Sequence, residues 1–248
     1  MKRLFCFLVL VQLFMACDYM DGLTENGEQV RKTYDAEGFE RIILDTSVRL
    51  VLTNEPLQNI EAEGPDFAMP RLKVFQEEDE LHIESDGIFG FRQKQMPVVR
   101  VGAENVQYIR SNLASEITNK DTLDIGQLRV VISGSGSFTE CDLTVKGKKL
   151  DLSVFGSNVG DHRLAGEVST LRVISEGLTS VDAAELITEN ATYHQRSVNP
   201  GYVYATGHLK VEMSSSGNIY YRGNPETEVE YGDPLYETDL GNVIDNSP

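Results

Sequence analysis

Apolar and polar side chains alternate with a period of two from Phe39 onward. Alternate positions between Ile42 and Leu52 carry apolar residues or threonine, and Leu81 and Ile83 repeat the pattern further along. This period is typical of β-strands with one buried face, because successive side chains of a strand point to opposite sides of the sheet. No stretch shows the helical period of an amphipathic helix. The sequence therefore predicts an all-β protein.

The alternation also recurs at longer range. Segments with the same apolar pattern begin at nearly equal intervals, except for a shorter last one, at Leu128, Leu150, Leu171, Tyr193 and Leu209. The second inward position of each segment would be Val130, Leu152, Val173, Gln195 and Val211, so that Gln195 makes the fourth copy degenerate. Repeats of about 20 residues with a turn at a fixed phase predict a parallel β-solenoid of stacked coils. A sandwich of antiparallel hairpins is the alternative, although it does not require a constant phase.

Two finer expectations follow from this phase. The residue after each first inward position should face solvent in one exposed ladder, which would contain Arg129, Asp151, Arg172, His194 and Lys210. Asp151 would then lie between two arginines, an arrangement that is mildly stabilising. The glycines that follow the segments, such as Gly134, Gly156 and Gly177, should permit turns with positive φ.

The N-terminal residues predict export and lipid anchoring. Residues 1–16 have the pattern of a signal peptide, with Lys2 and Arg3 before an apolar run too short to cross a bilayer as a helix. The run ends in Phe-Met-Ala-Cys, which resembles the lipobox of bacterial lipoproteins, so Cys17 is the predicted lipidation site. The anchor predicts a membrane partner and a place in the bacterial envelope, with the outer membrane expected and its side left open. Residues 17–37 are polar and aperiodic, as in a tether.

The C-terminal part is rich in tyrosine and acidic residues. Exposed tyrosines can stack on sugar rings or pack on a protein surface. The candidate binding face therefore consists of Tyr202, Tyr204, Tyr220 and Tyr221. The alternative is that these rings pack the last coils. Residues 227–248 lose the repeat and are acidic, and we expect them to cap the open end of the β-helix domain, which spans residues 38–226.

Composition excludes several classes of function. The net charge of -17 argues against nucleic acid as a partner, because a phosphate-binding surface needs clustered Lys and Arg. Three cysteines and four histidines without ligand spacing predict no metal site and no cofactor. The densest acidic run, Glu77 to Glu80, lies between two strand-like segments and is expected to be a hairpin tip. No catalytic residue is predicted.

Particular motifs resemble one known family. FERIILDTSVRLVLTNEP from Phe39, LKVFQEEDELHIES from Leu72 and SSSGNIYYRGNP from Ser214 are similar to segments of the family "putative auto-transporter adhesin, head GIN domain". The resemblance covers roughly residues 38–226 and implies a right-handed parallel β-helix and an envelope lipoprotein. It brings no catalytic residues. The chain departs from the family pattern where Asn199 and Ser215 replace the turn glycine of earlier repeats.

Three functions remain open at this point. The first is non-catalytic adhesion or ligand binding, to a glycan or a surface protein, which predicts a broad aromatic or acidic face. The second is a carbohydrate-active enzyme, of the polysaccharide lyase or hydrolase type, which needs two carboxylates and a Lys or Arg converging on one exposed face. The third is a lipid-binding or structural envelope protein, and lipid binding needs an apolar pocket large enough for an acyl chain. The sequence sets no oligomeric state.

Overall fold

The computed structural model describes residues 27–54, 60–86, 96–134, 138–234 and 239–247, so Cys17 lies outside the described residues. The described chain is all-β, as predicted, and contains no helix. Consequently, no helix in these ranges is long and apolar enough to cross a membrane. The strands are β1 (Gln29–Tyr34), β2 (Arg41–Asp45), β3 (Arg49–Thr53), β4 (Ile60–Pro65), β5 (Leu72–Glu77), β6 (Glu80–Ser85), β7 (Val98–Gly102), β8 (Tyr108–Ser111), β9 (Glu116–Asn119), β10 (Leu123–Ile132), β11 (Glu140–Val154), β12 (Val159–Ser197), β13 (Gly201–Met213), β14 (Ile219–Arg222), β15 (Glu226–Tyr231) and β16 (Val243–Asp245).

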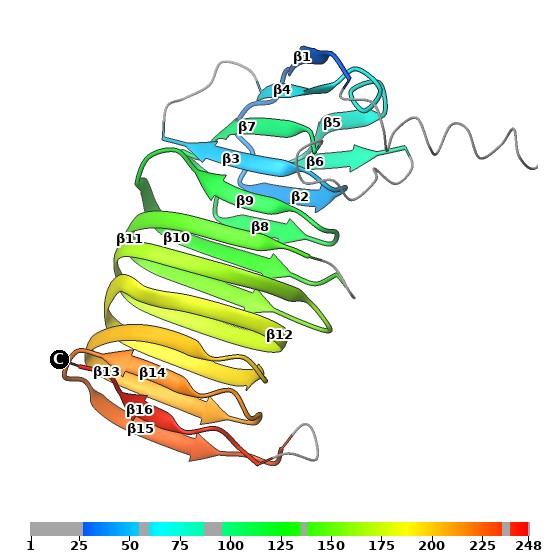
Figure 1. The fold of residues 1–248 in the computed structure, drawn as a ribbon. Coiled ribbons are helices and arrows are strands. Elements are labelled where there is room, and N and C mark those ends of the chain that lie inside the picture. The colour runs from blue at the N-terminus through cyan, green and yellow to red at the C-terminus, as the bar shows by residue number, and fades with distance from the viewer. Residues whose placement is uncertain (1–26, 55–59, 87–95, 135–137, 235–238, 248) are drawn as a thin grey trace, which may run out of the picture.

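The strands stack into a parallel β-solenoid, which Figure 1 shows as successive coils along one axis. Leu128 pairs with Leu150, and Leu150 pairs with Leu171, so the predicted repeat is the length of one coil. Further along, Ala191 pairs with Leu209, which means that the later coils are shorter. From β6 and β7 near one end to β15 and β16 at the other, successive coils pair parallel. This pairing confirms the solenoid and rules out the sandwich of antiparallel hairpins.

Two columns of paired strands matter for function. Ladder A contains β6, β2, β8, residues 128–132, 150–154, 171–175, 190–195 and 208–213, and β15. Ladder B contains β7, β3, β9, residues 140–142, 162–163, 181–183 and 201–203, then β14 and β16. Inward side chains of both ladders fill one continuous core. In ladder A, a fully buried apolar row runs through Leu81, Ile42, Ile109, Val130, Leu152 and Val173.

The shorter coils correct part of the predicted phase. Tyr193 pairs with Val211, and Gln195 pairs with Met213, two residues later than the spacing of the early coils predicted. The fourth coil is therefore regular, with Ala191 at its first inward position. Gln195 is fully buried because its side-chain amide donates a hydrogen bond to the Asn199 carbonyl (2.8 Å).

The outward ladder also differs from the prediction beyond the third coil. Arg129, Asp151 and Arg172 pair in register, as expected. The Asp151 carboxylate forms its ion pair with Lys149 on its own strand (3.0 Å). Because the later coils are shorter, Lys210 pairs with Thr192 and His194 pairs with Glu212, so His194 and Lys210 lie in different rows.

The turn glycines follow the prediction in part. Gly156 and Gly177 have φ values of 76° and 79°, whereas Gly134 is not among the glycines with positive φ. The hairpin predicted at the acidic run is confirmed, because β5 and β6 pair antiparallel and Glu78 turns with a φ of 53°. This turn conformation is uncommon for a residue with a Cβ atom.

The two ends of the solenoid differ from the predicted tether and cap. Residues 29–34, assigned to the tether, form β1, which pairs antiparallel with β4. Strand β4 in turn pairs antiparallel with β7, so that β1, β4 and β5 cover the N-terminal end (Figure 1). At the other end, β15 and β16 pair parallel with β13 and β14 and add a further coil. Strand β15 keeps the alternation of the earlier coils, because Thr227, Val229 and Tyr231 pair with inward residues of β13. The acidic residues between them made this alternation hard to recognise in the sequence.

Candidate binding surfaces

Two tyrosines stack on the outer side of ladder B. Tyr202 of β13 pairs in register with Tyr220 of β14, and their ring centroids lie 5.3 Å apart with an interplanar angle of 16°. Both rings point outward, because their strand neighbours Gly201, Val203 and Ile219 are buried. The parallel register creates this stack, since equivalent positions of successive coils lie directly above each other. A stacked aromatic pair adds about 0.5–1.5 kcal/mol beyond its buried area.

The other two predicted tyrosines lie differently. Tyr204 is on the outer side of β13 and pairs with Arg222. Tyr221 alternates to the inner side, pairs with Val203 and packs against the core. Three of the four tyrosines therefore lie on the outer side, of which Tyr202 and Tyr220 stack, and Tyr221 belongs to the interior of the last coils.

Charged residues extend the tyrosine stack along ladder B. Asp182 pairs with Tyr202 on the side opposite Tyr220. A hollow of about 280 Å³ lies here, lined by Arg163, Leu164, Asp182 and Glu185. We call Arg163, Asp182, Tyr202 and Tyr220 the ladder-B row. It combines an aromatic platform with carboxylate and guanidinium groups, which form hydrogen bonds with hydroxyl groups.

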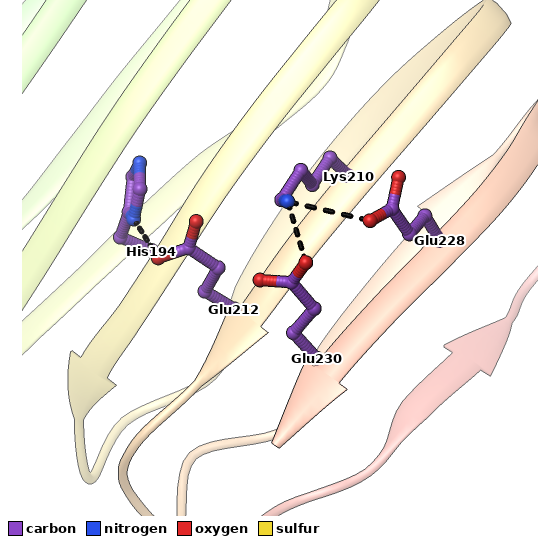
Figure 2. Close-up of polar contacts among 5 residues, drawn as sticks. All are labelled: His194, Lys210, Glu212, Glu228 and Glu230. Atoms are coloured by element: carbon purple, nitrogen blue, oxygen red, sulfur yellow. Dashed lines mark hydrogen bonds and ion pairs between the residues drawn. The ribbon is translucent and has the colours of Figure 1, made fainter. Parts of the chain in front are cut away.

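A second group of polar side chains lies on ladder A near the same end. Figure 2 shows His194, Lys210, Glu212, Glu228 and Glu230, which we call the charged cluster. His194 Nδ1 lies 2.6 Å from Glu212 Oε2. The Lys210 ammonium lies 3.3 Å from Glu228 Oε1 and 2.7 Å from Glu230 Oε1. In-register pairing of Lys210 with Glu228 and of Glu212 with Glu230 builds the cluster.

The charged cluster meets the geometric requirement of the enzyme hypothesis but lacks acid–base tuning. The hydrogen bond to Glu230 raises the pKa of Lys210, and the same bond lowers the pKa of Glu230. Both groups are therefore charged at neutral pH. A general acid or base works best with a pKa near the operating pH. Here the pKa of Lys210 and the pKa of Glu230 both move away from neutral pH, as in a structural ion-pair network.

A buried Cys–His neighbour pair is also unsuited to catalysis. Cys141 and His162 pair in register on the inner side of ladder B, and each is about 1% exposed. Burial raises the pKa of the Cys141 thiol to about 12 and lowers the pKa of His162 to about 4. A cysteine nucleophile needs its thiolate form. The pair is consistent with the prediction that Cys141 is a small residue of the core.

A further hollow, of about 260 Å³, is lined in part by Lys146, Glu167, Val168, Ile187 and Glu189. Its walls carry charged side chains, as do those of the hollow beside Asp182. An acyl chain requires apolar walls, because burying an unpaired charge against hydrocarbon is costly. Neither of these two hollows fits the lipid-binding hypothesis.

Comparison with known proteins decides the family. The family described as "Putative auto-transporter adhesin, head GIN domain" matches residues 38–225. The chain belongs to this family. The match confirms the resemblance inferred from the motifs, with nearly the same boundaries. A search of curated proteins finds no match.

Solved structures of similar proteins share the fold. A putative adhesin from Bacteroides fragilis aligns with a TM-score of 0.72 and 16% identity, over 88% of this chain and 97% of that one. A putative adhesin from Parabacteroides distasonis aligns with a TM-score of 0.65 and 16% identity, over 89% and 98%. A putative lipid binding protein from the same species aligns with a TM-score of 0.59 and 15% identity, over 90% and 98%. At these identities the likeness establishes the fold alone.

Sequence reasoning missed the charged neighbours of the tyrosines. The spacing between Tyr202 and Tyr220 equals that between the paired residues Ala191 and Leu209 of the later coils, and this was the available signal. With the longer spacing of the early coils, Tyr202 and Tyr220 would not be expected to pair. The neighbours Arg163 and Asp182 become visible only once the register of each coil is known.

Proposed function

We propose that this protein is a lipid-anchored protein of the bacterial cell envelope that binds glycans without catalysis, through the ladder-B row. The Tyr202–Tyr220 stack beside Arg163 and Asp182 is the observation that carries this proposal. Tyr220 covers one face of the Tyr202 ring, and Asp182, which lines the hollow, pairs with Tyr202 from the opposite side. We infer that the second face of the Tyr202 ring is available on that side. A sugar ring can stack on that face while its hydroxyl groups bond to the charged side chains. The family description as an adhesin supports the same role.

Binding should depend on the aromatic platform. The chain from Asp18 onward, which retains every described residue, is tested for saturable binding on a glycan array. We expect Tyr202→Ala to weaken binding about tenfold, equivalent to the roughly 1.4 kcal/mol that one stacking contact supplies. Tyr231→Ala is the matched control, because Tyr231 is an exposed tyrosine on β15 of ladder A. Equal losses in both variants, or no binding by the parent protein, would refute the role of the ladder-B row.

The enzyme is the second candidate, favoured by the convergence of Glu212, Glu230 and Lys210 on one face. The same wells are assayed for released reducing sugars and unsaturated products. We expect none. Product that disappears in Glu230→Gln but persists in Tyr202→Ala would place catalysis on the charged cluster and replace the binding proposal.

Anchoring should depend on one thiol. In bacterial cells, Cys17→Ser is expected to abolish incorporation of labelled fatty acid and to move the protein out of the membrane fraction. The lipobox-like residues before Cys17 supply the reason. A membrane-bound, lipid-labelled Cys17→Ser variant would contradict the anchor. An anchored protein can act only at the membrane that holds it, so the same fractionation also identifies that membrane.

A further inference from the structure

Three metal-ligating side chains meet at the N-terminal end of ladder A, far along the chain from the surfaces above. Strand β2 pairs with β6 so that Ile43 lies opposite His82 and Asp45 lies opposite Glu84. The spacing of His82 and Glu84 puts both on the outer side of β6, since side chains alternate along a strand. One ligand atom each from Asp45, His82 and Glu84 lies within 4.8 Å of the other two, and all three residues are half-buried.

Two of these groups, Asp45 and Glu84, are carboxylates that lie opposite each other on neighbouring strands. Carboxylates directly opposite each other on neighbouring strands are destabilising. Lys73 of β5 pairs with Glu84 of β6. Its ammonium forms an ion pair with Asp86 (2.6 Å) and not with Glu84. Within the described ranges, no Lys, Arg or His forms an ion pair with Asp45 or Glu84. A cation held between the two carboxylates would remove this repulsion.

Neighbouring groups hold the ligands in place. The His82 imidazole stacks on the Phe75 ring, with centroids 5.2 Å apart and an interplanar angle of 10°. His82 Nε2 lies 3.3 Å from Glu80 Oε2, and the Arg41 guanidinium holds the other Glu80 oxygen at 3.0 Å. Asp45 accepts a 2.6 Å hydrogen bond from the Asn112 amide. Metal ligands are characteristically oriented by carboxylates and amides of this kind.

We propose that Asp45, His82 and Glu84 bind a divalent transition-metal ion, with Zn²⁺ the best match. One imidazole and two carboxylates suit Zn²⁺, whereas a site for Ca²⁺ would use oxygen ligands alone. Three protein ligands leave a coordination position open to water or to a group of a binding partner. The ion would join β2 to β6 and so fasten the N-terminal end of the described solenoid. This site is independent of the proposed glycan binding.

Calorimetric titration with ZnCl₂ tests the site in the chain from Asp18 onward. This chain lacks Cys6 and Cys17, and its remaining thiol, Cys141, is buried, so thiol binding does not interfere. We expect one Zn²⁺ per chain and at least a tenfold weaker affinity in both Asp45→Asn and Glu84→Gln, which keep the side-chain shapes. Glu80→Gln should weaken binding by about 10- to 100-fold, as expected for a group that orients a ligand.

His208→Gln is the control, because His208 forms an exposed pair with Glu226 (3.3 Å) on the surface of the C-terminal coils. It should bind Zn²⁺ like the parent protein. Co²⁺ provides a second readout, since its visible absorption should appear on binding and vanish in His82→Gln while circular dichroism stays unchanged. No binding, tighter binding of Ca²⁺ than of Zn²⁺, or a loss in His208→Gln with none in Asp45→Asn would each overturn the assignment.

Discussion

Replacing Gly166 by alanine is expected to lower the free energy of unfolding by about 3 kcal/mol, combining backbone strain with a steric clash. Gly166 has a φ of 106°, a conformation that residues with a Cβ atom rarely adopt. A Cβ atom there would lie 2.0 Å from the Val145 carbonyl oxygen of the preceding coil. Because that oxygen belongs to the backbone of the paired strand, relief requires the two coils to separate locally.

Gly126→Ala is the matched control in an exposed position of β10. A Cβ atom at Gly126 would meet no atom within 4 Å. Urea denaturation followed by circular dichroism should show a much lower midpoint for Gly166→Ala and a nearly unchanged midpoint for Gly126→Ala. Equal midpoints would mean that the coils containing Val145 and Gly166 do not approach each other as closely as their register requires.

Acidification is expected to destabilise the protein through one buried histidine. His162 is about 1% exposed, and neither ring nitrogen has a hydrogen-bond partner among the described residues. Burial lowers its pKa from 6.5 to about 4, because the interior disfavours the imidazolium. Between these values the unfolded chain binds a proton that the folded chain does not, so stability falls as pH falls. The loss begins near pH 6.5 and reaches about 3 kcal/mol near pH 4.

His162→Leu should remove this component while filling a similar volume. Unfolding free energies of both proteins are measured by urea denaturation between pH 7 and pH 4. The variant should gain about 3 kcal/mol relative to the parent protein over this range. The comparison matters because carboxylates with lowered pKa, such as Glu230 and Asp245, lose stabilisation in both proteins at low pH. His208→Gln, at an exposed position, should retain the parent's pH dependence, and parallel curves for His162→Leu would disprove the argument.

The regular coils were predictable because their physics is local. Alternation places Val130, Leu152 and Val173 inside the solenoid whatever the neighbouring coils do, and all three are fully buried. The nearly constant spacing between Leu128, Leu150 and Leu171 also fixed their pairing. The same argument failed at Tyr193, where the coil shortens. A shift of two residues leaves the alternation intact, so no local pattern reveals it.

The sequence by itself determined the strand composition, the stacking of coils, the family and the predicted anchor, because period, repeat length and motif are properties of the chain alone. Tertiary structure decided which residues meet. The stack of Tyr202 on Tyr220, the cluster around Lys210 and the triad of Asp45, His82 and Glu84 each join residues from different coils or strands. Their contacts depend on the register between strands. That register is set by turn lengths and core packing over the whole solenoid, which no single segment encodes.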